Sequence, residues 1–355
     1  LLIRFRIDGV LHIQTEADSK ISTALVLRLK LMSGLDISEK RLPQDGRFNI
    51  KLRGSNVDVR ISTMPTQHGE SVVMRLLAQN TGLLELDRLF MPPRVLERFR
   101  HAIQRPSGIV LVTGPTGSGK TTTLYAAMNE LNSPEKKIIT VEDPVEYRLP
   151  GLNQVRVHEK IDLSFTRVLR TALRQDPDII LVGEIRDQET AEIAMRAAMT
   201  GHLVLSTLHT NDALSTPIRL LDMGVPRYMV ALSIQMVLAQ RLVRVICNQC
   251  RRVVEYPDSY LVESGLDPGV WREVTFHEGA GCFECGGTGF RGRTAIHELL
   301  DLSERIREMV LDKRPTSEIK RIAREEGMKF LRESALEKAR AGTTTLREIN
   351  KVTFI

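Results

Sequence analysis

Residues 114–121 read Gly-Pro-Thr-Gly-Ser-Gly-Lys-Thr, which has the residue types and spacing of a phosphate-binding loop. An apolar run precedes this segment and a helix-forming run follows it, as the motif requires. Glycines let backbone N–H groups converge on phosphate oxygens, and a helix N-terminus favours an anion. We therefore expect a nucleotide site here, with a chance glycine-rich turn as the alternative. The predicted contacts are Gly114, Pro115, Thr116, Gly117, Ser118, Gly119, Lys120, which reaches the β- and γ-phosphates, Thr121, which holds Mg²⁺, and Thr122.

Two acidic clusters follow apolar runs downstream of this loop. Glu184 comes after the run at 179–182, where a carboxylate can order Mg²⁺ or the attacking water. Glu142, Asp143 and Glu146 come at the end of another apolar run, and Glu146 is our candidate general base. The ends of parallel strands meet at one crevice, so both clusters are expected beside the phosphate loop. Helix capping or solvated loop charge is the alternative for any single carboxylate.

His209 also follows an apolar run, at 203–205. An imidazole at a strand end can hydrogen-bond a γ-phosphate and report its loss, although a lone histidine is more often structural.

Four arginines are candidates for binding phosphate through their planar donor forks. Arg60 alternates with apolar neighbours in a strand-like segment, and Arg75 interrupts an apolar run. Arg170 and Arg174 are one helical turn apart and share a face. Each could equally be a surface or salt-bridged arginine, so the sequence alone assigns none of them.

All the cysteines fall into two C-x-x-C pairs, which are Cys247 with Cys250 and Cys282 with Cys285. Four thiolates can close one tetrahedron around a structural zinc ion. The separation between the pairs is longer than in usual zinc ribbons, so redox-active thiols and metal-free cysteines stay open as alternatives. Paired cysteines with none left over suit a reducing compartment such as the cytoplasm.

The candidate site residues lie in segments that predict at least two domains of different class. Alternating apolar residues and one amphipathic helix predict a small α+β domain up to about residue 88, before a linker at Pro92 and Pro93. From residue 94 the chain shows short apolar runs separated by helix-length segments, which indicates an α/β core with a parallel sheet covered on both faces. The cysteine segment forms a third unit, and the sequence beyond Gly292 has the period of helices.

The length, charge and aromatic content of the chain limit the classes of protein to which it can belong. The chain has 355 residues, 42% of them hydrophobic, enough for two or three domains. None of its apolar runs approaches the roughly 20 residues of a membrane span. Leu1 opens directly into a strand-like pattern, so we expect sequence to be missing before it. The net charge of +6 suits an anionic partner, but an aromatic content of 5% argues against a nucleic-acid translocase.

Taken together, these motifs resemble those of the secretion-type ATPases that drive type II secretion and type IV pilus assembly. The resemblance covers nearly the whole chain. It rests on the phosphate loop and on the segments Arg60-Ile-Ser-Thr-Met-Pro-Thr66, His68-Gly-Glu70 with Arg75, Thr140-Val-Glu-Asp-Pro-Val-Glu146, Gly183-Glu184-Ile-Arg-Asp187, Leu205-Ser-Thr-Leu-His-Thr-Asn211, Ala239-Gln-Arg-Leu-Val-Arg244 and the two cysteine pairs.

The resemblance implies an α/β fold in which a PAS-like α+β domain precedes a RecA-like P-loop ATPase domain. It also implies an inserted tetracysteine zinc subdomain and C-terminal helices. The expected bounds are 1–88 for the PAS-like domain, 89–93 for the linker, 94–246 for the ATPase core, 247–290 for the tetracysteine subdomain and 291–355 for the helical region.

The family pattern further implies that Arg60 and Arg75 reach the nucleotide from the first domain, while Arg170 and Arg174 are additional phosphate-facing candidates. Glu146 and Glu184 would act on water and Mg²⁺. The expected cofactors are ATP, Mg²⁺ and Zn²⁺.

By the same resemblance, we expect a homo-hexamer that is peripheral on the cytoplasmic face of the inner membrane. Its partners would be an inner-membrane platform protein and a membrane-anchoring protein, with no nucleic acid. Assembly of pilus or pseudopilus subunits is the expected function, and type II secretion export is the close alternative. The cysteine pairs argue against a retraction motor, and both intact acidic clusters argue against a non-hydrolysing scaffold. The family has further N-terminal domains, which bind a membrane-anchoring partner or in some members cyclic-di-GMP, and we expect these domains to lie outside the sequence given.

Overall fold

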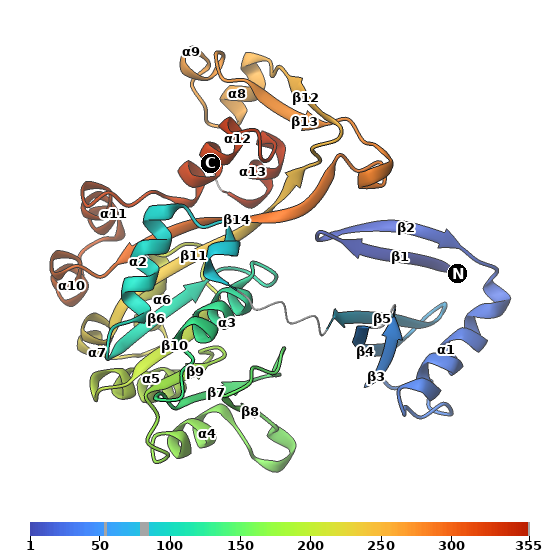
Figure 1. Cartoon of the computed structure of the whole chain (residues 1–355), viewed down its shortest axis with the longest axis horizontal. Helices are drawn as coiled ribbons and strands as arrows, with labels where there is room; N and C mark the ends of the chain where they lie inside the picture. Colours follow the sequence, from blue (N-terminus) through green and yellow to red (C-terminus); the bar gives the residue numbers. More distant parts are fainter. Residues whose placement is uncertain (53–54, 79–84, 354–355) are drawn as a thin grey trace. The chain divides into compact units, whose positions relative to one another are not determined.

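The computed structural model describes residues 1–52, 55–78 and 85–353, whose helices and strands are drawn in Figure 1. The chain divides into two units, Leu1–Gly82 and Leu83–Ile355. The sequence placed the end of the first domain at residue 88, but Leu86 is buried among core residues of the second unit. The break between the units therefore lies before Leu86.

The first unit contains the predicted hairpin, helix and strand pair, together with one further strand. Asp8 and Gly9 turn the hairpin with φ values of 49° and 86°, the left-handed region that an Asp-Gly turn uses. The turn predicted at residues 54–56 lies partly outside the described residues. The elements are β1 (Leu2–Ile7), β2 (Val10–Glu16), α1 (Ser22–Met32), β3 (Gln44–Leu52), β4 (Ser55–Thr66) and β5 (Gly69–Ala78), with β3, β4 and β5 forming one antiparallel sheet.

The second unit is built on a seven-stranded sheet of order β14-β11-β6-β10-β9-β7-β8. Neighbouring strands are parallel except for β11 and β14. The four apolar runs predicted as parallel strands are β6, β7, β9 and β10, and every residue in these four strands is buried. The strands are β6 (Gly108–Thr113), β7 (Ile138–Glu142), β8 (Asn153–Arg156), β9 (Ile179–Val182), β10 (Leu203–Leu208), β11 (Ile234–Ile246) and β14 (Phe290–Asp301).

Helices cover both faces of this sheet, and successive residues of β6 point into opposite cores, as the pleat of a strand requires. Val110 packs in the core that α2 and α3 close, whereas Ile109 packs in the core that α5 and α7 close. The expected α/β arrangement is confirmed. The helices are α2 (Pro93–Ile103), α3 (Lys120–Leu131), α4 (Phe165–Ala172), α5 (Gln188–Met199), α6 (Ser215–Asp222) and α7 (Arg227–Ser233).

The cysteine segment is an excursion between β11 and β14, which pair with each other (Figure 1). It contains β12 (Arg251–Val254), α8 (Asp258–Glu263), α9 (Pro268–Trp271) and β13 (Phe276–Gly279). The prediction of helix beyond Gly292 is wrong up to Asp301, because β14 is the antiparallel edge strand of the core sheet. Residues 294–300 are all buried, polar ones included, so the sequence there lacks the alternation of a half-exposed strand.

After β14 the chain is helical as predicted. The helices are α10 (Glu304–Leu311), α11 (Thr316–Glu325), α12 (Leu331–Arg340) and α13 (Leu346–Val352). In the described part of the chain, every helix is too short or too polar to cross a membrane.

Candidate functional site

The phosphate loop lies between the end of β6 and the start of α3. Gly114 has a φ of 142°, and a Cβ there would lie 2.4 Å from the carbonyl oxygen of Gln240, so a larger residue does not fit. Lys120 Nζ donates to the carbonyl oxygens of Gly114 at 2.7 Å and Pro115 at 3.2 Å. Burial lowers the pKa of Lys120, and the charge of Glu184 acts in the opposite direction.

The loop fits an anionic ligand. Among the described residues, the hydroxyl of Ser118 is buried within the loop and has no hydrogen-bond partner. Gly117 and Gly119, with φ values of 79° and 90°, hold the backbone in a left-handed path that few other residues adopt. A phosphate bound at the N-terminus of α3 would accept a hydrogen bond from this unpaired hydroxyl.

Gln240 holds this loop in place, a role that the sequence did not assign. It lies on β11, is 1% exposed, and its Nε2 donates to the carbonyl oxygen of Ser118 at 2.7 Å. Its Oε1 accepts from Thr123 Oγ1 on α3 at 2.8 Å. Gln240 belongs to the quoted segment at 239–244, but only the pairing of β11 with β6 brings it to the loop.

Glu184 lies just beyond β9 and contacts the side chains of Arg186 and His209. Arg186 pairs with Glu184 Oε1, and His209 Nε2 lies 3.4 Å from Glu184 Oε2. Burial raises the pKa of Glu184, but Arg186 and His209 outweigh it, so the pKa lies below its ordinary value. Arg186 also lies 3.8 Å from Asp143 and thus joins the two acidic clusters, a link that the sequence did not reveal.

The cluster after β7 has a different environment. Glu142 is 4% exposed and accepts from Thr140 Oγ1 at 2.5 Å, from the Tyr125 hydroxyl and from Gln154 Nε2 at 3.3 Å. Burial raises its pKa above the ordinary value. The Tyr125 hydroxyl also accepts from the backbone N–H of Glu146 at 3.2 Å. Both oxygens of Glu142 therefore have hydrogen-bond partners, and the half-buried Glu146 stays the predicted base of this cluster.

His209 directly follows β10, whose last residue Leu208 pairs with Thr113 at the start of the phosphate loop. The strand ends of β6, β10, β9 and β7 are neighbours in the sheet. His209 and Glu184 therefore lie in contact at strand ends next to the phosphate loop, a pairing that the sequence did not predict.

The candidate arginines fall into two groups. Arg60 and Arg75 are directly opposite each other on β4 and β5, and Arg47 on β3 is opposite Arg60. Like charges that lie directly opposite each other on neighbouring strands are destabilising. Arg47 was not among the predicted residues, because only strand register places it in this row.

Arg170 and Arg174 lie on α4. Arg170 forms an ion pair with Glu189 on α5 at 2.5 Å. Arg174 donates to the carbonyl oxygen of Arg170 at 2.9 Å. Within the described residues, their partners therefore come from α4 and α5, and neither contacts the phosphate loop.

The four cysteines form one cluster. Their Sγ atoms all lie within 4.8 Å of one another, and three of the separations are 3.7 to 3.9 Å. Sulfurs bound to one zinc ion at about 2.3 Å in a tetrahedron are about 3.8 Å apart, so the spacing fits. Backbone donors, chiefly the N–H of Cys282, lower the pKa of Cys285 to about 6, whereas burial raises the pKa of Cys250 to about 11.

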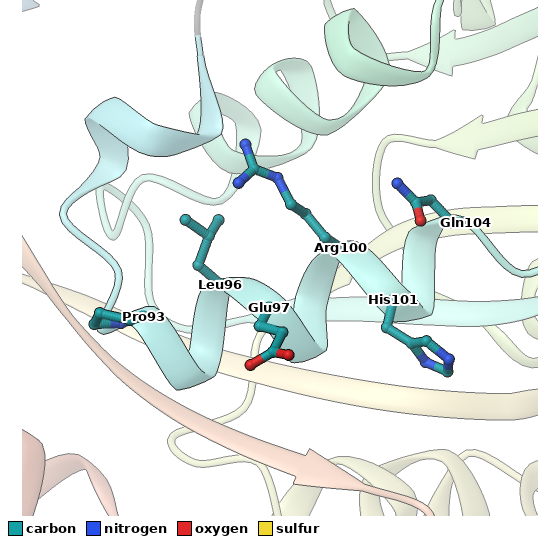
Figure 2. A pocket seen from close by; sticks show the side chains of 6 residues that line it. All are labelled: Pro93, Leu96, Glu97, Arg100, His101 and Gln104. Atoms are coloured by element: carbon teal, nitrogen blue, oxygen red, sulfur yellow. The ribbon is translucent and has the colours of Figure 1, made fainter.

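A hollow of about 430 Å³ lies elsewhere, on the exposed side of α2. Figure 2 shows that its lining side chains come from this single helix. Arg100, one of them, is already paired with Asp87 and Glu130. The hollow is therefore not a second nucleotide site. Its lining residues are Pro93, Leu96, Glu97, Arg100, His101 and Gln104.

The family model described as "Type II/IV secretion system protein" matches residues 1–351. The chain belongs to this family. It is 50% identical to the type II secretion system protein HxcR of Pseudomonas aeruginosa, a match that covers 99% of this chain and 71% of that protein. It is 49% identical to the type IV pilus assembly ATPase PilB of Myxococcus xanthus, covering 98% of this chain and 62% of that protein.

The type II secretion system ATPase E of Vibrio cholerae is 47% identical to this family member over 99% of the chain and 70% of that protein. A crystal structure of the pilus retraction motor PilT with bound ADP superimposes with a TM-score of 0.65 at 26% identity, covering 99% of this chain and 90% of that one. The fold is therefore that of the secretion ATPases, and this chain is an ATPase.

Proposed function

We propose that this chain is a hexameric motor ATPase that couples Mg-ATP hydrolysis to the addition of pilus or pseudopilus subunits at the inner membrane. The observation that carries the proposal is the meeting of the phosphate loop, Glu184 and His209 at adjoining strand ends. Export by type II secretion is the second candidate, because relatives with secretion names are about as similar to this chain as the pilus ATPase is.

In the proposed reaction, water attacks the γ-phosphorus and the bond to the β,γ-bridging oxygen breaks. The loop amides and Lys120 hold the phosphates, and Glu146 takes the proton from the water. Thr121 and Glu184 would hold Mg²⁺, which when bound neutralises charge on the β- and γ-oxygens. His209, in contact with Glu184, would register the loss of the γ-phosphate.

The arginine row on β3, β4 and β5 would supply donors to the phosphates of a neighbouring subunit. Guanidinium groups bind phosphate in a bidentate fashion, and an arginine acting from another subunit can raise the rate by roughly 10³ to 10⁵-fold. Arg170 and Arg174 on α4 are further candidates for binding phosphate, and Arg170 pairs with Glu189. This proposal makes hydrolysis depend on assembly of the ring.

The remaining family properties are also proposals. The first unit would be PAS-like and the second a RecA-like core. Cys247, Cys250, Cys282 and Cys285 would hold a structural zinc ion, which the measured sulfur spacing supports. The ring would lie at the cytoplasmic face of the inner membrane and contact a platform protein and a membrane-anchoring partner.

A metal assay on the purified chain tests the zinc site. We expect about one zinc ion per chain in the parent and none in the double variant Cys247→Ser/Cys282→Ser.

The test of the motor proposal is steady-state Mg-ATP hydrolysis at increasing protein concentration, with the oligomeric state measured in each sample. The specific activity should rise as hexamers form, and Arg60→Ala should abolish the rise while nucleotide binding persists. Arg28→Ala, at an exposed position on α1 of the same unit, is the matched control and should behave like the parent. Hexamers that bind ATP but do not hydrolyse it would refute the proposal.

A further inference from the structure

Glu298 lies on β14 opposite Ala239 of β11, and it is 3% exposed. Its Oε1 accepts from the backbone N–H of Ala213 at 2.9 Å, and its Oε2 accepts from the backbone N–H of Leu331 at 2.8 Å. Ala213 closes the loop that carries His209, and Leu331 is the first residue of α12. One buried carboxylate therefore joins the loop beside the nucleotide site to the C-terminal helices.

The other side of the same loop is fixed to the phosphate-loop strand. Thr113, the last residue of β6, accepts from the backbone N–H of Thr210 at 3.0 Å, and their hydroxyls are 2.6 Å apart. The hydroxyl of Thr210 also lies 2.7 Å from that of Thr216 on α6. The loop at 209–213 is thus held between β6 and Glu298 by buried hydrogen bonds.

Through Oε2, Glu298 accepts from the first backbone N–H of α12, that of Leu331. Leu331, Ala335 and Ala339 of this helix are buried in the core that also contains Ile296 and Leu300 of β14. A displacement of the loop that lengthened the hydrogen bond from Ala213 would leave the Glu298 carboxylate with a single backbone partner. The carboxylate could then shift, and the hydrogen bond from the backbone N–H of Leu331, in the first turn of α12, would change with it.

Burial raises the pKa of Glu298 to about 7, while the N–H groups of Leu331 and Ala213 act in the opposite direction. The charged groups that also act on it are Asp212, which raises the pKa, and Lys320 on α11, which lowers it. Arg241 on the neighbouring strand β11 also interacts with Glu298, whose charge raises the pKa of Arg241. A buried group that ionises near neutral pH costs stability, and such groups are frequent at functional positions.

We propose that Glu298 is a positioning residue that couples the loop carrying His209 to the first turn of α12, so that the nucleotide state is transmitted to the C-terminal helices. The proposal rests on the ATPase function proposed above. The carboxylate touches no reacting atom, and its effect comes through the two backbone N–H groups that it holds.

The test compares the parent chain with Glu298→Gln and the matched control Glu348→Gln. Glu348 is also a buried carboxylate of the C-terminal region, but it pairs with Arg244 and not with the loop. Two quantities are measured for each protein. The first is kcat and KM for Mg-ATP between pH 6 and 9. The second is hydrogen exchange at residues 331–334 with and without a non-hydrolysable ATP analogue.

We expect Glu298→Gln to lower kcat about 10-fold with KM changed less than about twofold, because one charge-assisted bond of the pair is lost. The kcat of the parent should fall below pH 7 as Glu298 takes up a proton, whereas that of Glu298→Gln should not show this fall. The analogue should slow exchange at residues 331–334 in the parent and in Glu348→Gln but not in Glu298→Gln.

The proposal is overturned if the analogue leaves exchange at residues 331–334 of the parent unchanged, a result that needs no variant to fold. It is equally overturned if Glu298→Gln keeps the parental kcat and exchange response, or if Glu348→Gln loses both to the same extent. A parent that binds the analogue and shows the exchange response but hydrolyses no ATP would refute the proposed function and leave the coupling intact.

Discussion

Two strand ends in the same sheet present carboxylates in opposite environments. Glu142, the last residue of β7, is bound by hydroxyl and amide groups, and burial raises its pKa. Glu184, after β9, is bound by Arg186 and His209, which bring its pKa below the ordinary value. A position at a strand end near the phosphate loop is therefore not enough to identify a catalytic carboxylate, because the side chain's partners also matter. Glu142 is held by neutral hydrogen-bond donors, which suits a supporting role, whereas the lowered pKa of Glu184 suits the role on Mg²⁺ and water that we propose for it.

The largest effect is expected for Glu184→Gln. The amide cannot supply the negative charge that the proposed Mg²⁺ site needs, so kcat should fall by about 10³-fold, which corresponds to several kcal/mol of transition-state stabilisation. Nucleotide binding should persist, as measured by fluorescence of a labelled ATP analogue. Glu192→Gln on α5, whose carboxylate pairs with Arg196, is the control and should stay within about twofold of the parent.

Glu146→Gln should have the next largest effect. Removal of a general base typically lowers the rate by about 10²-fold or more, and binding of ATP does not require it. Single-turnover kinetics on preformed hexamers would measure the chemical step directly. A rate equal to that of the parent would assign the base to another group and would remove the distinction drawn between Glu142 and Glu146.

Tyr125→Phe tests the supporting role of the first cluster. The change deletes the hydroxyl that donates to Glu142 and accepts from the N–H of Glu146, and leaves the buried ring in place. We expect kcat to fall about 5- to 10-fold with KM nearly constant, as for the loss of one hydrogen bond. Tyr147→Phe is the control, because its ring packs edge-on against Tyr125 at 5.7 Å. Equal losses in both variants would indicate a packing effect.

The smallest effect is a difference in the pH dependence of stability. Because the pKa of Glu142 is raised on folding, the ionised form opposes folding, so Glu142→Gln should gain stability relative to the parent as pH rises above about 4.5. The pKa of Glu184 is lowered, so its stabilisation is present above about 4.5 and is lost as pH falls. Glu184→Gln should therefore lose stability relative to the parent as pH rises toward about 4.5. Chemical denaturation between about pH 3 and 8 covers both windows and measures both slopes. Slopes of the same sign for the two variants would contradict the contrast between Glu142 and Glu184.

Local patterns in the sequence predicted four strands of the core sheet and the phosphate loop. The runs that became β6, β7, β9 and β10 are short and wholly apolar, which is typical of strands buried on both faces. The phosphate loop was recognised from eight consecutive residues, because backbone geometry there depends on local glycines. Glu184 and His209 were found because each follows such a strand.

The rest of the site depends on contacts between distant segments, which local patterns do not reveal. Gln240 reaches the phosphate loop only through the pairing of β11 with β6, and Arg47 joins Arg60 only through strand register. Glu298 was missed because β14 was read as helix. In a strand buried on both faces, polar residues such as Glu298 lose the regular spacing that marks them in the sequence.

The most direct test of this account is single-turnover hydrolysis of Mg-ATP by sized hexamers of the parent, Glu142→Gln and Glu146→Gln, after nucleotide binding has been verified for each. The account predicts that Glu142→Gln retains hydrolysis to within about fivefold, because an amide can replace a carboxyl that is held by neutral partners. It predicts that Glu146→Gln loses hydrolysis. An inactive Glu142→Gln beside an active Glu146→Gln would contradict the account.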